Sequence, residues 1–441
     1  MNAPETPTGD GRQPATVDRL SQHIGETVTI RGWLTNRRSS GRIHFLEVRD
    51  GTGVVQAVMR AQSVDAELFQ AVDHLSQETA VIVHGAPRAD QRAPGGVELD
   101  VTGLDVVGPS DGYPITPKEH GVDYLMEHRH LWVRSPRQAA ILRLRARIIH
   151  AIRTFLDDNG FVLADPPIIT PAAAEGTTTL FGLDYFGEPA YLSQSGQLYM
   201  EALCLALGRV YSFGPTFRAE KSKTRRHLTE FWMVEPEMAY CDFEESLEWQ
   251  ERLVAHVVAD VLDHSAAELA AVGRDAASLA AVRPPFPRLS YDEALAILAD
   301  AGMPLAWGDD FGAAHETFLA DRFDRPVFIH RFPTKAKAFY MKPDPARPEV
   351  VLAADLLAPE GYGEIIGGSQ RVDDLALLEQ RLGEHGLPPE NYGWYLDLRR
   401  YGSVPHAGFG LGLERLVAWI GGLEHVRETI PFARTITRVW P

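Results

Sequence analysis

Cysteine is scarce in this sequence of 441 residues, and long apolar runs are missing. With only Cys204 and Cys241, neither a disulfide framework nor a cysteine-rich zinc site is plausible, and a reducing, cytoplasmic location is expected. No apolar run reaches membrane-spanning length, so we expect no membrane partner. Residues 1–16 have neither a basic start nor an apolar core of signal length, which favours a flexible tail over a signal peptide.

Positive charge is also in deficit, since the formal net charge is -17. A protein that coats nucleic acid nonspecifically needs a basic surface, so any RNA contact must be local. Lysine is rarer than arginine, with 6 lysines against 37 arginines, and five of the six lie within 221–223 and 335–342. We take this clustering as support for anion-binding loops in these two stretches.

Residues 17–107 predict a small β-barrel. They contain five short strand-like runs, with a helical segment at 63–75 between the later ones. This order is typical of an OB-type barrel, a fold that binds single-stranded nucleic acid. The stretch 27–46 holds four arginines, Arg31 among them, and no acid. It therefore forms a local basic patch within an acidic chain.

The rest of the chain predicts a second, larger domain. Residues 108–136 are rich in proline, glycine and polar side chains, which indicates a linker, and 137–441 follow as the second domain. This domain begins with a predicted amphipathic helix at 137–158 and a strand after it. A largely helical insertion is expected at about 243–330.

The stretch 211–240 predicts a strand, a basic loop and a second strand. Residues 211–217 and 231–240 are aromatic-rich and largely alternating, as expected of antiparallel strands that each bury one face. In the loop between them, residues 218–226 have Glu220 as the one acid among five cations. These cations are Arg218, Lys221, Lys223, Arg225 and Arg226. Such a hairpin can hold a polyphosphate, although the loop taken alone favours an ordinary solvated tip.

A glycine-rich stretch lies near the C-terminus. Gly408, Gly410 and Gly412 alternate along a predicted strand that runs into a helix at Leu413. The pattern is neither a dinucleotide-binding fingerprint nor a phosphate-binding P-loop. Alternating glycines leave one strand face bare, so that a flat ligand or another backbone can approach closely.

Together these stretches resemble the class II aminoacyl-tRNA synthetases. Phe217 to Glu220, followed by Arg226 to Phe231, resembles motif 2 of that class, and Gly408 to Arg415 resembles motif 3. The helix at 137–158 and the following strand with Pro167 resemble motif 1, the dimer interface, so a homodimer is expected. The resemblance implies an α+β fold with an N-terminal OB-fold barrel that binds the anticodon. It further implies a catalytic domain with an antiparallel sheet flanked by helices.

The resemblance implies ATP and Mg²⁺ as cofactors. Arg218 and Arg415 become the catalytic residues, with Arg218 between the substrate carboxylate and the α-phosphate, and Arg415 against the adenine and near the terminal phosphate. The further ATP contacts that the resemblance implies are Glu220 at the adenine edge, His227 at the γ-phosphate, Phe231 stacked on the base, and Glu364. Asp355 and Glu364 become the magnesium ligands, since Mg²⁺ takes few protein carboxylates. Without the resemblance, solvated acids at strand ends are an equal alternative.

The amino-acid pocket and the anticodon site are implied in the same way. The residues expected to hold the amino acid are Glu175, Ser193, Gln194, Gln197, Glu235 and Arg371. Among them, the glutamate at 175 and the glutamines hold the ammonium group, and Arg371 the side-chain carbonyl. Phe45 and Gln56 are expected to stack on and pair with an anticodon base, beside Arg31 in the basic patch. Phe45 is equally plausible as a core residue.

The substrate is asparagine or aspartate. The stretch 395–415 most resembles the asparaginyl-tRNA synthetases, with the aspartyl enzymes next. Aspartyl enzymes typically carry QSPQLYKQ, where this chain has Met200 in place of the lysine, and an aspartate where it has Glu235. Both changes disfavour an acidic substrate, so L-asparagine and tRNA(Asn) are expected. Plain core packing on a helix remains the alternative for Met200.

Three other functions remain as alternatives. The first is an aspartyl-tRNA synthetase, possibly a non-discriminating one. The second is a tRNA-independent ligase that forms asparagine, but such paralogues typically lack the OB domain predicted here. The third is a non-catalytic RNA-binding protein, which would be expected to lose Arg218 or Arg415, and both are present.

Overall fold

The computed structural model describes residues 13–171, 174 and 179–441. The chain divides into two compact units, 1–126 and 127–441, which are considered separately below. None of the helices in the described residues is long and apolar enough to cross a membrane.

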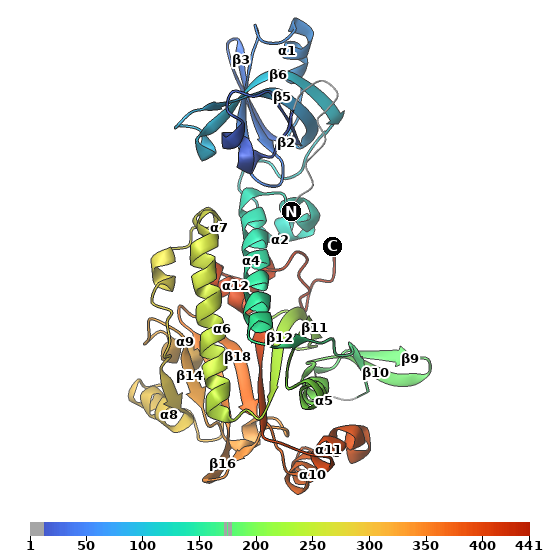
Figure 1. Cartoon of the computed structure of the whole chain (residues 1–441), viewed down its shortest axis with the longest axis vertical. Helices are drawn as coiled ribbons and strands as arrows, with labels where there is room; N and C mark the ends of the chain where they lie inside the picture. Colours follow the sequence, from blue (N-terminus) through green and yellow to red (C-terminus); the bar gives the residue numbers. More distant parts are fainter. Residues whose placement is uncertain (1–12, 172–173, 175–178) are drawn as a thin grey trace. The chain divides into compact units, whose positions relative to one another are not determined.

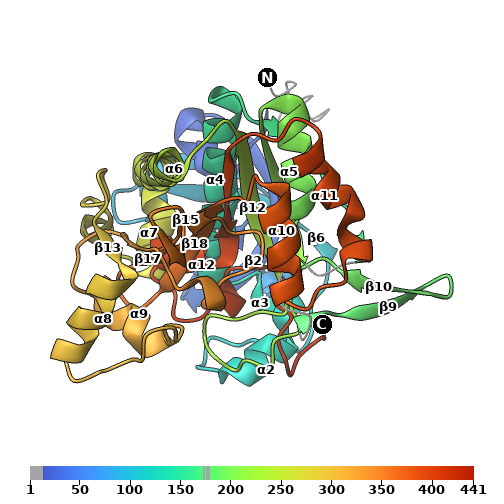
Figure 2. The same cartoon turned by 90° about the horizontal axis from the view of Figure 1, so that it is seen from below.

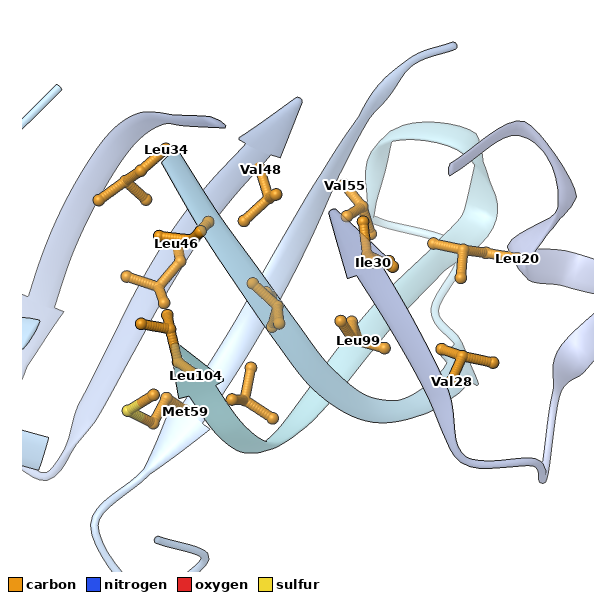
Figure 3. Packing of buried hydrophobic residues seen from close by; sticks show 14 of the residues in the cluster. Leu20, Val28, Ile30, Leu34, Leu46, Val48, Val55, Met59, Leu99 and Leu104 are labelled. Carbon is orange, nitrogen blue, oxygen red and sulfur yellow. The ribbon is translucent and has the colours of Figure 1, made fainter. Parts of the chain in front are cut away.

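The first unit is a closed β-barrel. Its strands are β2 (Val28–Ser40), β3 (Ile43–Arg49), β4 (Val54–Arg60), β5 (Thr79–Ala89) and β6 (Val97–Gly108). The order is β2-β3-β4-β6-β5, and β2 also pairs with β5, which closes the barrel. Along β3, buried residues such as Leu46 and Val48 point into the core and alternate with residues that face outward (Figure 3). This alternation along the strands confirms the predicted OB-type barrel.

Two smaller elements complete the barrel. Helix α1 (Ala66–Val72) lies between β4 and β5 and is capped by Asp65, whose side chain accepts a hydrogen bond from the Leu68 amide at 2.8 Å. The predicted tail at 1–16 is wrong in its last residues. Strand β1 (Gln13–Pro14) pairs in parallel with β2, and Ala15 packs against the barrel core. Residues 1–12 lie outside the described residues.

Short helices lie within the predicted linker at 108–136. They are α2 (Val122–Glu127) and α3 (Arg129–Trp132). The guanidinium of Arg129 is buried and donates to the carbonyl oxygens of Pro431 at 2.8 Å and Ile430 at 2.9 Å. These bonds tie α3 to the C-terminal segment of the second unit.

The second unit is built on a sheet that has eight strands among the described residues, in the order β13-β14-β17-β18-β19-β12-β11-β7. In that order the strands are β13 (Arg288–Ser290), β14 (Val327–His330), β17 (Ala353–Ala358), β18 (Gly363–Gln370), β19 (His406–Gly412), β12 (Glu230–Ala239), β11 (Arg209–Phe217) and β7 (Val162–Leu163). The pairings from β14 to β11 are antiparallel. The predicted basic hairpin is therefore confirmed as β11 and β12, and the glycine strand β19 lies between β12 and β18.

Helices and small hairpins surround this sheet. The helices are α4 (Pro136–Asp158), α5 (Gln197–Leu207), α6 (Phe243–His264), α7 (Ala266–Val272), α8 (Tyr291–Asp300), α9 (Ala313–Ala320), α10 (Leu375–Glu384), α11 (Gly393–Arg400) and α12 (Leu413–Gly421). The short strands are β8 (Ile169–Thr170), β9 (Gly182–Tyr185), β10 (Glu188–Leu192), β15 (Pro343–Asp344) and β16 (Arg347–Val351). Helices α4 and α6 run side by side along the sheet (Figure 1).

The stretch 243–330 is more than a helical insertion. It contributes strands β13 and β14, which extend the central sheet beyond β17. Helices α8 and α9 lie at this edge of the sheet, and the β9–β10 hairpin lies at the opposite edge (Figures 1 and 2). The helices pack their apolar side chains, such as Leu298 and Leu319, against Val327 of β14. No periodic pattern in the sequence predicts β13 and β14, because strands of three or four residues are too short to show one.

Candidate active site

Two adjoining cavities lie on the sheet within the described part of the second unit. The first has a volume of about 260 Å³ and is lined by the base of the β11–β12 hairpin, by β19 and by the start of α12. It brings together all six residues predicted to bind the nucleotide, which are Arg218, Glu220, His227, Phe231, Glu364 and Arg415. The second cavity, about 440 Å³, shares Arg218, Met233, Glu364 and Gly410 with the first. A ligand that occupies both would therefore pass between Arg218 and Glu364.

The two predicted arginines are held by different contacts. Arg218 follows β11 directly, and its guanidinium carbon lies 5.5 Å from the centroid of the Phe231 ring. Arg415 lies in the first turn of α12 and donates from Nη1 to the carbonyl oxygen of Glu364 at 2.8 Å and to its carboxylate at 3.4 Å. Its Nε donates to the carbonyl oxygen of Arg226 at 3.3 Å. Two residues that are far apart in the sequence thus both line the first cavity.

The glycines of β19 serve two purposes. A Cβ atom at Gly408 would overlap the Glu237 carboxylate, and one at Gly410 would overlap the Met233 side chain, so both positions allow close packing against β12. A Cβ at Gly412 would meet nothing within 4 Å. The prediction of a bare strand face therefore holds for the cavity beside Gly412, whereas side chains of β12 cover the other two positions.

His227 lies in the first cavity among charged groups. Its ring is half-buried, and its Nε2 is 3.5 Å from the Glu220 carboxylate. Burial, and next the positive charge of Arg415, lower the pKa of His227 below its ordinary value. The ring is therefore mostly neutral at neutral pH, and an anion placed beside it would favour its charged form.

Glu235 occupies the floor of the second cavity. Its carboxylate accepts hydrogen bonds from the Ser195 hydroxyl, from the Gly196 amide at 2.9 Å and from the Ser212 hydroxyl at 3.2 Å. Burial raises its pKa, while these three hydrogen bonds oppose the rise. The surrounding donors hold the carboxylate in one orientation, toward the cavity that it lines.

Beside Glu235, a second acid holds the predicted Arg371. The Nε and Nη2 atoms of Arg371 each lie 2.9 Å from a carboxylate oxygen of Glu237, and its Nη1 donates to the Ser369 hydroxyl at 2.7 Å. Sequence reasoning missed Glu237. The strand period of two could have found it, because Glu237 follows Glu235 on the same face of β12. Both residues line the second cavity with Arg371.

Behind the cavity lies a buried polar network centred on Glu201, which sequence reasoning also missed. The Glu201 carboxylate accepts hydrogen bonds from Tyr395 at 2.7 Å, from Arg399 at 2.6 Å and from Gln197 at 2.9 Å. His406 Nε2 lies 3.0 Å from the same carboxylate. Although burial acts in the opposite sense, Arg399 and His406 hold the pKa of Glu201 below its ordinary value. Because Gln197 donates its amide group to Glu201, its amide oxygen is the atom that a substrate ammonium group can use.

Three predicted residues of the amino-acid pocket are not brought to the cavity by the described coordinates. The Ser193 hydroxyl donates to the Ser195 carbonyl oxygen at 2.8 Å, and Gln194 donates to the Thr179 hydroxyl at 2.7 Å. Both side chains are buried, and neither is among the described residues that line these two cavities. Glu175 lies outside the described residues.

Met200 does not face the amino-acid pocket. It is fully buried in a small cluster with Cys204 and Val210, and among the described residues it lines neither cavity. Its side chain lies on the face of α5 that packs on the sheet. Position 200 therefore makes no direct contact with a substrate in this cavity, whereas Glu235, Glu237 and Arg371 are among the charged residues that line it.

The two predicted magnesium ligands lie on neighbouring strands. Asp355 of β17 and Glu364 of β18 converge over Gly367, where an added Cβ would lie 3.6 Å and 2.8 Å from their respective carboxylate oxygens. The Nζ of Lys337 donates to Asp355 at 2.7 Å. Burial raises the pKa of Asp355, Lys337 opposes the rise, and Glu364 adds to it. Two converging carboxylates fit a magnesium ion that keeps most of its waters.

In the first unit, Phe45 and Gln56 lie on neighbouring strands of the barrel. Phe45 is half-buried and alternates with the buried His44 and Leu46, so it faces outward and is not a core residue. The guanidinium carbon of Arg38 lies 4.4 Å from the Phe45 ring centroid, and Arg38 donates to the Gln56 amide oxygen at 2.9 Å. An aromatic ring, an amide and a cation therefore meet on one outer face.

Other residues extend this outer face. Gln56 donates to the Glu98 carboxylate at 2.5 Å, and Arg88 forms an ion pair with the same carboxylate. Arg31 is exposed on β2. Sequence reasoning did not single out Arg38 or Glu98 as members of this cluster, because their proximity depends on the register of β2, β4 and β6.

Comparison with known proteins agrees with this geometry. Residues 121–436 match the family of class II tRNA synthetases (D, K and N), and residues 28–107 match the OB-fold nucleic acid binding domain. The asparagine–tRNA ligase of Pelotomaculum thermopropionicum is 59% identical over 425 residues, which cover 96% of this chain and 99% of that protein. The chain belongs to the asparagine–tRNA ligases. This membership confirms the resemblance seen in motifs 2 and 3.

Further relatives agree with the family assignment. The asparagine–tRNA ligase of Desulforamulus reducens is 60% identical over 429 residues, which cover 97% of this chain and 100% of that protein. The crystal structure of asparaginyl-tRNA synthetase from Pyrococcus horikoshii, complexed with asparaginyl-adenylate, superposes with a TM-score of 0.93 at 47% identity, covering 95% of this chain and 97% of that one. A putative aspartyl-tRNA synthetase from Leishmania major reaches a TM-score of 0.85 at 26% identity, covering 99% and 96%. The predicted α+β fold class of this family is confirmed.

Proposed function

We propose that this protein joins L-asparagine to tRNA(Asn) with ATP, through an asparaginyl-adenylate, and releases AMP and pyrophosphate. The observation that carries the proposal is the meeting of the two cavities at Arg218 and Glu364. A nucleotide in the first cavity and an amino acid in the second would have their reacting ends at this junction. Family membership and the adenylate bound by the Pyrococcus enzyme support the same reaction.

The first step needs no nucleophilic side chain. An oxygen of the asparagine carboxylate attacks the α-phosphorus of ATP, and the bond from that phosphorus to the oxygen bridging the β-phosphate breaks, so that pyrophosphate leaves. Arg218, His227 and Arg415 all line the first cavity. Arg218 would lie where the two negatively charged reactants meet, and His227 and Arg415 would contact the leaving pyrophosphate. Catalysis then rests on positioning and charge neutralisation.

Asp355 and Glu364 would hold magnesium, which when bound neutralises charge on the phosphates. Lys337 holds one carboxylate of the pair from within the second cavity. In the second step the acyl group of the adenylate passes to a hydroxyl of the terminal ribose of tRNA, and AMP leaves. Phe231, on the strand opposite Arg218, offers a ring against which the adenine base can stack.

Selection of asparagine follows from the charges in the second cavity. Arg371 can donate to the side-chain carbonyl that asparagine and aspartate share, but Glu237 already neutralises it. Glu235 can accept a hydrogen bond from the amide NH₂ of asparagine, whereas it would repel the carboxylate of aspartate. A polar pocket of this kind can discriminate by about 10⁴-fold. Gln197 accepts from the substrate ammonium group, with Glu175, Ser193 and Gln194 as further members of the loop around it.

We further propose that residues 17–107 read the anticodon of tRNA(Asn), that 108–136 connect this domain to the catalytic residues 137–441, and that the enzyme is a homodimer. Phe45 would stack on an anticodon base and Gln56 would hydrogen-bond its edge, with Arg31 near the phosphates. The contacts of Arg38 with both side chains support this role, since a cation beside a stacking ring suits a nucleotide.

The test is pyrophosphate exchange into ATP with each amino acid, followed by charging of isolated tRNA. We expect exchange with asparagine to exceed exchange with aspartate by at least about 10³-fold. An Arg218→Ala variant should lose exchange with either amino acid. Faster activation of aspartate would identify an aspartyl enzyme, and formation of free asparagine from aspartate and ammonia would identify a tRNA-independent ligase.

A further inference from the structure

Arg226, in the basic loop, lines the nucleotide cavity, but its guanidinium is held by groups that do not line it. Its Nη1 donates to the Glu316 carboxylate at 2.9 Å, and its Nη2 donates to the Thr317 hydroxyl at 2.7 Å and to the carbonyl oxygen of Gly361. Glu316 and Thr317 belong to α9, a helix at the far edge of the sheet (Figure 2). Arg226 is thus one of the loop cations predicted to meet phosphate, yet α9 and the β17–β18 turn hold its guanidinium.

The backbone of Arg226 in turn contacts the nucleotide site. Its carbonyl oxygen accepts the hydrogen bond from Arg415 Nε at 3.3 Å. His227 is the next residue, and it lines the cavity together with Arg226 and Arg415. When its side chain is anchored, the backbone of Arg226 is held in place as well. The carbonyl oxygen that orients Arg415 and the position of the next residue, His227, are then fixed too.

The turn between β17 and β18 is shaped around this ion pair. Gly361 and Gly363 have φ angles of +77° and +71°, in the left-handed region that favours glycine. A Cβ at Gly363 would overlap both the Arg226 guanidinium and the Glu316 carboxylate. The Gly361 amide also donates to Asp321, just after α9, at 3.2 Å. The loop, the turn and the helix thus meet at one junction.

The buried guanidinium of Arg226 needs a carboxylate beside it to compensate its charge. The guanidinium of Arg226 is mostly buried, with 11% of its side chain exposed, and Arg415 lies close enough to lower its pKa, second among the lowering effects to burial. Glu316 is the carboxylate in direct contact with it. Burial and the nearby Glu364 raise the pKa of Glu316. Without this carboxylate, the buried cation would lose its ion-pair partner and keep the weaker influence of Asp321. Its guanidinium would then be free to leave α9, and the Arg226 backbone that contacts Arg415 would lose its anchor.

We propose that Glu316 is a positioning residue for the nucleotide site, acting from α9 through Arg226 on Arg415 and His227. Glu316 lines neither cavity in the described part of the chain. The inference rests on the proposed binding of ATP by Arg415. It goes beyond that proposal because it makes the affinity for ATP depend on a helix that does not contact the nucleotide.

The experiment measures KM and kcat in pyrophosphate exchange for Glu316→Gln in the full chain. We expect the KM for ATP to rise about tenfold while the KM for asparagine stays within about twofold. The matched control is Glu360→Gln, which removes a carboxylate paired with Arg274 beside the same turn and should leave both KM values unchanged. Glu316→Asp keeps the charge and should restore part of the loss.

A second variant guards against misfolding of the first. Thr317→Val removes the other α9 hydrogen bond to Arg226 without removing a charge, and it should raise the KM for ATP by about threefold. The inference is wrong if both variants fold and keep the wild-type KM for ATP, or if kcat falls and the KM for ATP does not change. The Arg415→Ala variant distinguishes failure of the proposed nucleotide site from failure of the proposed role of Glu316. If Arg415→Ala leaves the KM for ATP unchanged, the proposed nucleotide site is wrong. If Arg415→Ala raises that KM and the α9 variants do not, only the role of Glu316 fails.

Discussion

Glu237 holds Arg371 through two hydrogen bonds of 2.9 Å each, and both side chains are almost completely buried in the wall of the second cavity. The pair cancels the charge of the group that faces the substrate side chain. Although burial acts against it, Glu237 raises the pKa of Arg371 above its ordinary value, so the guanidinium stays charged. The cavity therefore presents a neutralised donor beside Glu235, whose carboxylate has hydrogen-bond donors around it but no ion pair within the described residues, and this arrangement favours an amide over an acid.

Glu237→Gln should weaken both folding and selection. The change leaves a buried guanidinium without its carboxylate, which costs about 3 kcal/mol of folding free energy for a broken buried pair. The uncompensated charge of Arg371 should then attract aspartate, so that the preference for asparagine falls by at least about tenfold. Thermal unfolding measures the first effect and exchange with each amino acid the second. Glu379→Gln, on the exposed face of α10, is the control, and a Glu237 variant with unchanged preference would contradict the argument.

Glu235→Gln tests the acceptor of the amide. The glutamine can keep the contacts with Ser195 and Gly196 but removes the charge that repels an acid. We expect the ratio of kcat/KM for asparagine to that for aspartate to fall by about 10²-fold, mainly through better activation of aspartate. The KM for ATP should change little, because Glu235 lines only the second of the two cavities. A loss of exchange with asparagine at an unchanged ratio would show that Glu235 is structural.

The sequence predicted those parts of the site that lie within local patterns. Arg218 and Arg415 each follow a strand that alternates, and motifs of fixed spacing identify them without any knowledge of tertiary contacts. Glu201, by contrast, is a single acid on an apolar helix, and its partner Arg399 lies 198 residues further along the chain. Its role depends on how α5 and α11 pack, which no local pattern encodes.

The same limit explains the errors and omissions. Met200 lies at a position where related enzymes carry a lysine, but the rotation of α5 directs it into the core with Val210. Glu316 lies in a stretch to which no chemistry was assigned, and it reaches the site only because β14 places α9 beside the β17–β18 turn. Residues that position other residues are joined by contacts between distant segments, whereas residues that touch the substrate recur in motifs.

Phe45→Ala tests the outer face of the barrel. Loss of the ring should remove about 1–3 kcal/mol of base stacking, so the KM for tRNA should rise about tenfold or more. Pyrophosphate exchange needs no tRNA and should remain at the wild-type rate. Trp33→Ala, another outward-facing aromatic residue of the barrel, is the matched control. If the two variants raise the KM for tRNA equally, the effect is general to the barrel surface and the anticodon role of Phe45 is wrong.

His227 predicts a pH dependence of ATP binding. Burial and Arg415 lower its pKa in the free protein, and a γ-phosphate beside the ring would raise it. Because the pKa is higher in the bound state, binding takes up a proton. Affinity for ATP therefore increases as the pH falls through the bound-state pKa, and the gain levels off below the lower pKa of the free protein.

The measurement compares the KM for ATP of the wild type with that of His227→Gln between pH 7.5 and pH 6. Protonation of ATP itself affects both proteins and cancels in the ratio. We expect the ratio of the variant KM to the wild-type KM to rise about threefold over this range, since the ordinary pKa of histidine is about 6.5. A ratio that does not change with pH would mean that the ring stays neutral beside the nucleotide. In that case His227 contributes a hydrogen bond and no charge, and Arg218, Arg415 and the proposed magnesium ion neutralise the phosphates without it.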